Sequence, residues 1–323
     1  MKLVGIRESY GEALAELGEI YPEIVVLDAD LSGSTKTSLF AKKFPDRFFN
    51  MGVAEQNMMG TAAGLAASGK TVFASTFAIF ASGRAWEQVR YNIVYNKLNV
   101  KIVASHGGVT VGEDGGSHQS AEDIAIMRVL PGMMVIVPVD GKEMKEVIRT
   151  IVKIPGPFYV RSSRIKFPLI LEEDYKFELG KGRIIREGKD VSLIGCGLMV
   201  SQCLEAAESL AKEGISARVV NLSTIKPIDE ALLIDCAIKT NGIVTTEEHS
   251  IIGGLGSAVT EIVSEKFPTL IYRVGVPDKF GISGSSTDLL EYLGLQPKKI
   301  MEAAQQIIEL SRKSKGKLAQ AAL

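Results

Sequence analysis

Short apolar runs alternate with longer helical stretches in the first half of the chain, and this order constrains the fold more than any other feature. The runs are compact, rich in β-branched residues and bounded by Gly, Pro, Asp or Ser, which is typical of buried strands. An alternation of this kind predicts a parallel sheet that helices cover on both faces. We expect strands at 24–27, 71–74, 100–104, 134–137 and 158–160, and helices at 54–68, 82–96, 119–129 and 141–153.

The alternation stops between Ile165 and Gly182, where Pro168, an acidic run and Gly180 interrupt it. It resumes afterwards, and a chain of 323 residues is long enough for two cores. The sequence therefore predicts two α/β domains on parallel sheets, the second sheet being mixed. The expected boundaries are 1–166 for the first domain, 167–184 for a linker, 185–312 for the second domain and 313–323 for a frayed tail. Within the second domain we expect strands at 190–195, 217–220, 242–245 and 269–272, and helices at 199–213 and 254–266.

The composition excludes several classes of partner. The formal net charge is −1 and 23% of the residues are charged, so we expect no basic surface for nucleic acid or for an anionic membrane. No run of roughly 18 apolar residues occurs, and a cytoplasmic protein is expected. The three cysteines, Cys196, Cys203 and Cys236, have no Cys-x-x-Cys spacing, which favours core packing over a disulfide or a metal site.

Three loops that follow predicted strands contain unusual chemistry. Ligands of open parallel sheets bind beyond the carboxyl ends of the strands, so these loops are the natural place for a site. The loops are 28–34, 75–80 and 105–119. The third holds two of the three histidines, five glycines, one Asp and one Glu. Such a loop is either a flexible excursion or a place where backbone approaches a ligand.

Glu55 is the one carboxylate at the start of a predicted helix that is otherwise built from small and apolar residues. Two interpretations are open: the helix dipole favours an acidic residue at this position, or the carboxylate faces a ligand. Two interpretations are also open for Phe77 and Phe80, which lie three residues apart after a strand: they pack in the core, or they stack on a ligand.

The motifs together resemble the C-terminal half of transketolase, a thiamine-diphosphate enzyme, over residues 1 to about 312. The likeness covers that family's pyrimidine-binding domain and its small C-terminal domain. It extends to Leu222–Pro227 and to Thr246–His249 with the glycines that follow. The motifs that carry it are Asp-Leu-x-x-Ser at 30–34, Gly-Val-Ala-Glu-Gln at 52–56, Ser-Thr-Phe-x-x-Phe at 75–80, Ser-His-Gly-Gly at 105–108 and Gly-Glu-Asp-Gly-Gly-Ser-His-Gln at 112–119.

The resemblance implies a role for each candidate side chain. Glu55 would protonate the pyrimidine ring of the cofactor, whose imino group then removes the proton from carbon 2 of the thiazolium ring. A carboxylate in an apolar enclosure suits this task, because its hydrogen bond to a ring nitrogen is stronger there than in water. The other implied roles are cofactor binding for Phe77, Phe80 and Asp30, phosphate binding for His106, Ser34 and Arg164 (preferred to Arg161), recognition of sugar hydroxyls for Asp114, and proton exchange near the reacting carbons for His118.

One family motif is missing. These enzymes hold Mg²⁺ and the diphosphate with Gly-Asp-Gly and a later Asn, and this chain has no Gly-Asp-Gly. The nearest string, Glu113-Asp114-Gly115-Gly116, lies in the third loop in the wrong order. We therefore expect no metal ligands here, a split transketolase, and a partner subunit that supplies the diphosphate and Mg²⁺ site within an α2β2 assembly in which this chain also meets its own copy. Ketol transfer between sugar phosphates, as in the pentose phosphate pathway, is the expected activity.

Three alternatives stay open from the sequence. The β subunits of 2-oxo acid dehydrogenases have the same architecture, but they lack the Ser-His-Gly-Gly to Ser-His-Gln loop. Deoxyxylulose-phosphate synthases typically have Arg at the place of His106. A non-catalytic scaffold partner would have no need of all the candidate side chains. In the second domain, Gly195-Cys196-Gly197 is explained by a strand-to-helix turn, and we expect His249 to support an interface with the first domain or with a partner.

Overall fold

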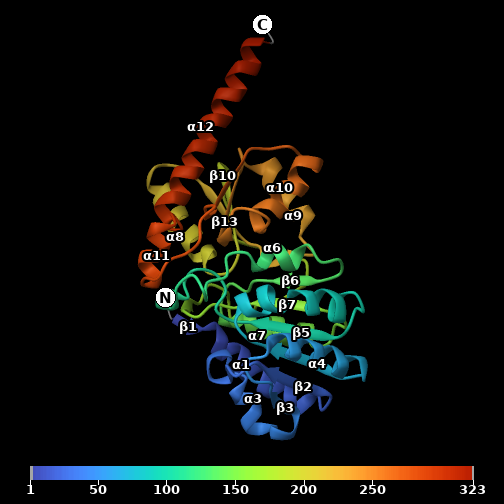
Figure 1. Ribbon diagram of the computed structural model, residues 1–323. Helices are drawn as coiled ribbons and strands as arrows, with labels where there is room; N and C mark the ends of the chain where they lie inside the picture. The colour runs from blue at the N-terminus through green and yellow to red at the C-terminus, as the bar shows by residue number, and fades with distance from the viewer. Residues whose placement is uncertain (1–2, 322–323) are drawn as a thin grey trace.

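A computed structural model describes residues 3–321 of the chain, with side chains to Lys313. Figure 1 shows two α/β units one above the other, the first half of the chain below and the second half above. Each half is organised around its own large sheet. The helices and strands follow the alternation predicted from the sequence, and the main differences lie at the sheet edges, in the segment 82–96 and at the end of the chain.

The first sheet has seven strands in the order β12-β6-β7-β5-β4-β2-β3. Six of them run parallel. The apolar runs predict five of these six, with several boundaries that differ by only one residue, and the edge strand β3 is not among the expected strands. The seventh, β12 (Thr224–Lys226), comes from the second half of the chain and pairs antiparallel with β6, so this sheet is mixed as well. The six parallel strands are β2 (Ile24–Asp28), β3 (Phe48–Asn50), β4 (Thr71–Ser75), β5 (Val100–Ala104), β6 (Met134–Ile136) and β7 (Phe158–Arg161).

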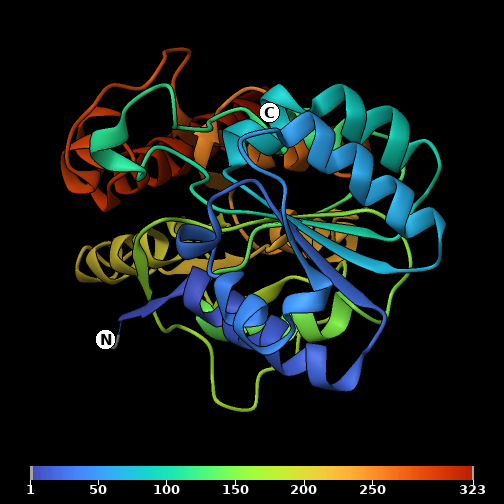
Figure 2. The ribbon, with the colours of Figure 1, turned by 60° about the horizontal axis from the view of Figure 1, so that its bottom comes forward.

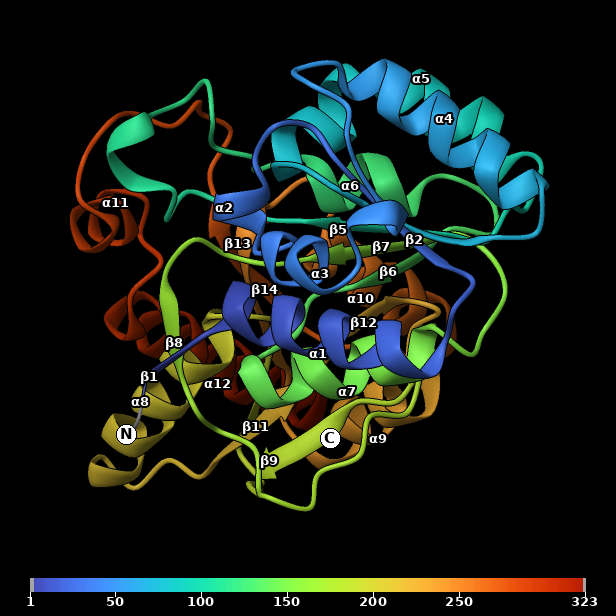
Figure 3. The same cartoon turned by 90° about the horizontal axis from the view of Figure 1, so that it is seen from below.

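Helices cover both faces of this sheet, as Figures 2 and 3 show from two sides. One face packs against an apolar cluster that includes Tyr10, Leu14 and Val147, and the other against a cluster that includes Met58 and Ile93. The first face carries α1 (Ile6–Ile20), α3 (Ser38–Lys43) and α7 (Gly141–Ile151), and the second carries α4 (Glu55–Ala67), η2 (Phe80–Arg84), α5 (Trp86–Gln88), η3 (Val89–Val94) and α6 (Asp123–Arg128); short helices α2 (Ser32–Thr35), η1 (Pro45–Arg47) and η4 (Gly112–Asp114) lie in the loops.

The expected helix at 82–96 is not one regular α-helix. Its place is taken by two π-helical segments, η2 and η3, on either side of the short α5. The amide of Ala85 donates to the Phe80 carbonyl at 3.2 Å, and the amide of Tyr95 donates to the Arg90 carbonyl at 3.0 Å, both across five residues. Residue spacing alone does not distinguish such wide turns from an α-helix, and π-helical turns occur often at functional sites.

The second sheet has the order β14-β13-β10-β11-β9. Four strands are parallel and β9 is antiparallel to β11, which confirms the mixed sheet expected here. Helices α8 and α12 pack on one face, and α9 and α10 on the other. The elements are β9 (Arg183–Arg186), β10 (Val191–Gly195), α8 (Met199–Lys212), β11 (Ala217–Asn221), α9 (Glu230–Lys239), β13 (Ile243–Ser250), α10 (Leu255–Lys266), β14 (Ile271–Val276), α11 (Ser286–Tyr292) and α12 (Pro297–Ala321).

The structure describes most of the segment 313–323, expected as a frayed tail, as part of a helix. Helix α12 continues to Ala321 and projects beyond the second sheet in Figure 1. The Lys, Ala, Leu and Gln residues of this segment are good helix formers even without an apolar stripe. The last two positions of the expected tail, 322 and 323, lie outside the described residues.

The two halves are joined by packing as well as by the chain. Strand β1 (Leu3–Gly5) pairs antiparallel with β8 (Lys166–Pro168), which begins the linker region. The carboxylate of Glu143, on α7, is fully buried. It accepts hydrogen bonds from Tyr175 Oη at 2.8 Å, Ser223 Oγ at 2.8 Å and the Val139 amide at 2.6 Å, and so connects the first domain to the linker and to the second half of the chain.

Replacing Glu143 with alanine is expected to lower the free energy of unfolding by about 3 kcal/mol or more, because several buried donors lose their acceptor at once. Chemical denaturation followed by circular dichroism measures this. Lys145→Ala, on the same helix but in a surface ion pair with Glu12, is the matched control and should change stability by about 1 kcal/mol or less. Equal losses in the two variants would contradict the bridging role of Glu143.

All three cysteines are buried and free, which confirms the prediction of core packing. In the described part of the chain no group of three or more His, Cys, Asp or Glu side chains could hold a metal ion. Nor does any helix among residues 3–321 have the length and apolar character needed to cross a membrane.

Candidate functional site

The candidate side chains gather at the carboxyl edge of the first sheet. The loops there follow β2, β4, β5 and β7, four parallel strands that end on the same side. Because neighbouring parallel strands end together, residues far apart in sequence meet there. The loop after β4 is joined to the loop after β5 by a bridge between Phe77 and Ser105.

Glu55 is the first residue of α4 and is only 1% exposed. Its Oε2 atom forms an ion pair with Arg84 Nη1 at 3.1 Å, and the Arg84 side chain is 51% exposed. The same guanidinium lies over the Phe80 ring, 4.9 Å from its centroid. The carboxylate is thus buried with a half-exposed cation as a partner. Sequence reasoning missed Arg84, because no motif connects it with a residue 29 positions earlier.

Aromatic rings form a wall next to this carboxylate. Phe77 and Phe80 are stacked, with centroids 5.9 Å apart and planes inclined by 13°. Phe77 also stacks on His106 with a centroid distance of 3.7 Å, and His118 lies edge-on to Phe80 with centroids 5.4 Å apart. The structure therefore brings four of the predicted site residues together: two phenylalanines and two histidines.

His106 is buried and has an uncommon backbone conformation. Its φ is 60°, which is uncommon for a residue other than glycine, and it is 3% exposed. Its Nδ1 atom lies 2.9 Å from Ser105 Oγ. Burial, with smaller contributions from the nearby charges of Arg7 and Arg164, lowers the pKa of His106 to about 3. The ring is therefore neutral near pH 7 and can offer an N–H group to an anion.

Two arginines converge beside His106. Arg7, in the first turn of α1, donates to the Ser34 carbonyl at 2.8 Å and to the Arg164 carbonyl at 3.0 Å. The pKa of Arg7 is lowered, chiefly by burial. The guanidinium of Arg164 bonds to the Val111 carbonyl. Sequence reasoning missed Arg7 because the N-terminal segment resembles an ordinary polar helix and has no glycine-rich loop to mark it.

Arg164 also connects this cluster to Asp114. Its Nη1 atom lies 3.6 Å from Asp114 Oδ2 and 3.4 Å from Glu113 Oε2, all at the exposed end of the third loop. Arg161, three residues earlier, is 5% exposed and is paired with buried Asp123 at 2.9 Å. Of the two arginines, Arg164 is the one that lies with the other candidate residues, which supports the preference for it.

Asp30 lies apart from these side chains among the described residues. It is exposed, has a φ of 63°, and accepts a hydrogen bond from Asn50 Nδ2 at 2.9 Å. The neighbouring Asp28 is buried instead, and its carboxylate accepts from Thr35 and Thr37 at 2.7 and 2.8 Å. Asp28 shapes the loop, while Asp30 is at its rim.

Comparisons with known proteins identify the class to which this fold and site belong. Residues 2–168 match the family described as "Transketolase, pyrimidine binding domain", and residues 180–300 match "Transketolase, C-terminal domain". The fold and the site define a thiamine-diphosphate-dependent transferase.

Within that class, the chain belongs to the transketolase family. It is 54% identical to the "Putative transketolase C-terminal section" of Methanocaldococcus jannaschii over 92% of this chain and 96% of that protein. It is 43% identical to the "6-deoxy-6-sulfo-D-fructose transketolase subunit SqwH" of Clostridium sp., covering 94% of each chain. A solved structure described as "Split gene transketolase, inactive beta4 tetramer" is 51% identical, with a TM-score of 0.87 over 95% of this chain and 100% of that one. The chain thus corresponds to the C-terminal section of a split transketolase, as the motifs predicted.

Proposed function

We propose that this chain provides the pyrimidine-activating and sugar-binding half of a transketolase site, and that it transfers a two-carbon ketol unit from ketose phosphates to aldose phosphates once a partner chain completes that site. The observation that carries the proposal is a convergence at one sheet edge. Buried Glu55, the stacked rings of Phe77 and Phe80, and two arginines beside His106 meet there.

The side chains present fit the pyrimidine end of thiamine diphosphate. Glu55 is a buried carboxylate, and its half-exposed partner Arg84 could turn away to let a ring nitrogen take its place. Phe77 and Phe80 offer an apolar stacking surface beside it and would exclude water. When bound, the cofactor supplies a nucleophilic carbon for the ketol carbonyl. Glu55 would hold the proton at the ring nitrogen, and Asp30 is proposed to contact the cofactor from the rim.

The rest of the cofactor site is proposed to belong to a partner. No cluster of acidic, His or Cys ligands occurs in the described part of the chain, and the sequence lacks Gly-Asp-Gly. We propose that an N-terminal transketolase subunit supplies the Mg²⁺ and diphosphate ligands in an α2β2 assembly. The split-gene transketolase of solved structure is described as inactive when it forms a β4 tetramer, which supports this arrangement. A cytoplasmic location and a place in pentose phosphate metabolism remain predictions.

The anion of the sugar is proposed to bind at Arg7, Ser34, His106 and Arg164. Two guanidinium groups whose charges act on a neutral imidazole suit a tetrahedral anion, since arginine can offer two N–H groups to it at once. The name of the Clostridium relative includes a sugar with a terminal sulfonate, which is also a tetrahedral anion. Asp114 would read sugar hydroxyls, and His118, which faces the aromatic wall, would exchange protons near the reacting carbons.

Replacing His106 or Arg164 with alanine is expected to raise KM for phosphorylated donors and to lower kcat/KM by about tenfold to a hundredfold, because each charge-assisted contact contributes roughly 1.5–3 kcal/mol. Turnover of hydroxypyruvate, which has no phosphate, should be nearly unchanged. Steady-state kinetics with both donors in the complete enzyme measures the difference. His118→Ala should instead slow both donors.

The matched control is Arg149→Ala, which removes an arginine on α7 that forms ion pairs with Glu16 and Glu146. Its kinetics should be those of the wild type with either donor. If His106→Ala and Arg164→Ala impair hydroxypyruvate as severely as the phosphorylated donor, the third loop has a structural role and the sugar-phosphate assignment fails. Wild-type kinetics of every variant with both donors would mean that these side chains do not act on the substrate.

A further inference from the structure

Residues 106–119, here called the substrate loop, carry His106, Asp114 and His118 on a backbone rich in glycine. Glycine loses more conformational freedom on ordering than any other residue, so such a loop needs external support to hold three side chains in place. The loop belongs to the first domain. Arg164 and Ser163 of the first domain hold part of it, and further supporting groups come from the second domain.

The central support is Glu248, on β13. This carboxylate is 4% exposed, and its Oε1 atom accepts hydrogen bonds from the Val109 amide at 2.8 Å and from the Thr110 amide at 2.6 Å. A Cβ atom at Gly108, where φ is 86°, would lie 2.3 Å from the same Oε1 atom. The loop backbone therefore comes very close to the carboxylate, and the positive φ at position 108 favours glycine there.

A second contact region lies in residues 281–286, just before α11 and in its first residue. Ser286 Oγ donates to the Thr110 carbonyl at 2.9 Å, and Gln119 Nε2 donates to the Ile282 carbonyl at 2.9 Å. A Cβ atom at Gly116 would lie 2.9 Å from the Gly281 carbonyl oxygen. Both ends of the substrate loop thus pack against this segment of the second domain.

Buried Arg161 connects β13 to the end of the loop. Its Nη2 atom donates to the Ser120 carbonyl, directly after the loop, at 3.1 Å and to the Glu248 carbonyl at 2.8 Å. Burial raises the pKa of Glu248, and the positive charge of Arg161 acts in the opposite direction. The arginine offsets part of the cost of burying that carboxylate and fixes β13 against the loop.

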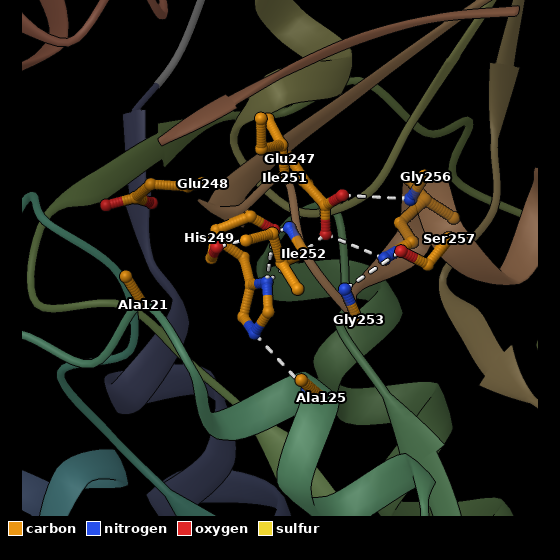
Figure 4. Close-up of polar contacts among 12 residues, drawn as sticks. Ala121, Ala125, Glu247, Glu248, His249, Ile251, Ile252, Gly253, Gly256 and Ser257 are labelled. Atoms are coloured by element: carbon orange, nitrogen blue, oxygen red, sulfur yellow. Dashed lines mark hydrogen bonds and ion pairs between the residues drawn. The ribbon is translucent and has the colours of Figure 1, made fainter. Parts of the chain in front are cut away.

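The neighbouring acidic residue, Glu247, provides an internal comparison. Figure 4 shows the two carboxylates pointing in opposite directions from β13. Glu247 is 1% exposed and accepts from the amides of Leu255 and Gly256 at 2.7 and 2.8 Å, at the start of α10 in its own domain. Glu247 and Glu248 have the same charge, similar burial and two backbone donors each, but only Glu248 reaches across to the substrate loop.

His249 adds a further link between the domains. Its Nε2 atom accepts a hydrogen bond from the Ala125 amide of α6 at 3.2 Å, and its Nδ1 atom lies 2.8 Å from the Ser250 carbonyl (Figure 4). The expectation that His249 supports the interface with the first domain is confirmed. This contact holds α6 rather than the substrate loop, so of the two residues it is Glu248 that reaches the loop from β13.

We propose that Glu248 is a positioning residue for ketol transfer, through which the second domain holds the substrate loop in its binding conformation. The proposal rests on the proposed function only for its effect on catalysis, because the state of the loop can be measured without substrate. Loss of the Glu248 acceptor should release Val109 and Thr110, and with them the side chains on either side.

Hydrogen–deuterium exchange of the isolated chain tests the first part. Glu248→Ala is expected to speed amide exchange within the substrate loop by about tenfold or more, because two charge-assisted bonds are lost. Glu247→Ala should speed exchange at the start of α10 and leave the loop unchanged. Glu248→Gln should restore slow exchange in the loop, since its amide oxygen can accept from the same two N–H groups.

Kinetics of the complete enzyme tests the second part. Glu248→Ala should raise KM for a phosphorylated donor and lower kcat, with Glu248→Gln close to wild type and Glu247→Ala unchanged in KM. If Glu248→Ala does not fold, Glu248→Asp decides the matter, because it keeps the charge beside Arg161 and withdraws the acceptor by one methylene. Wild-type loop exchange in a folded Glu248→Ala or Glu248→Asp chain, or equal loosening by Glu247→Ala, would overturn the proposal whatever the substrate is.

Discussion

Glu55→Gln is expected to lower the rate of ketol transfer by the assembled enzyme by about 10²–10⁴-fold, the range lost when a positioned acid or base is removed. The amide keeps the shape of the buried side chain but cannot hold or release a proton at the pyrimidine nitrogen. Exchange of the carbon 2 proton of the bound cofactor, followed by NMR in deuterated buffer, should slow in parallel. The fold should be intact, because Glu55 lies at a helix start and contacts a half-exposed arginine.

Glu19→Gln is the matched control for this variant. Glu19 is a carboxylate on the surface of α1, in an exposed ion pair with Lys43, and its replacement should leave the rate of ketol transfer unchanged. Binding of thiamine diphosphate, measured by calorimetry, gives a second readout besides activity, because the wild-type carboxylate contributes a charge-assisted bond to the ring. Proton exchange at the wild-type rate in Glu55→Gln would show that Glu55 is not the activating residue.

The isolated chain is expected to show no measurable ketol transfer with thiamine diphosphate and Mg²⁺, and activity should appear when an N-terminal transketolase subunit is added. The physical reason is that Mg²⁺ requires several oxygen ligands in fixed geometry, and the described residues offer no such cluster. Coupled assays of xylulose 5-phosphate and ribose 5-phosphate conversion measure the activity. Light scattering of the mixture should show an assembly with two copies of each chain.

Robust turnover by this chain alone would refute the split arrangement. Formation of a complex without activity would be a different result, since it would leave the partnership intact and favour the scaffold interpretation. Where the assembly is active, the Glu55 variant then tests whether this chain takes part in the chemistry, because only an active wild-type complex can lose activity when the carboxylate is replaced.

The sequence by itself determined the class of fold and most of the residues of the candidate site. Buried parallel strands need continuous apolar runs, and their loops meet at one edge, so the motifs around Glu55, Phe77, His106 and His118 had to converge. The Glu-Gln motif and the two-histidine loop also carried the family resemblance that the comparisons confirmed. Local patterns of this kind predict both which element forms and which side chains lie at its end.

Only the tertiary structure decided which distant residues complete the site. Arg7 reaches a carbonyl 157 positions away, Glu248 reaches an amide 138 positions away, and β12 crosses from the second half of the chain to the first sheet. No sequence motif around Arg7 or Arg84 identifies either arginine as a site residue, because the residues that each one contacts are brought near it by the packing of other elements. Periodicity reports which face of an element is buried, but the contacts between elements depend on how whole layers pack together.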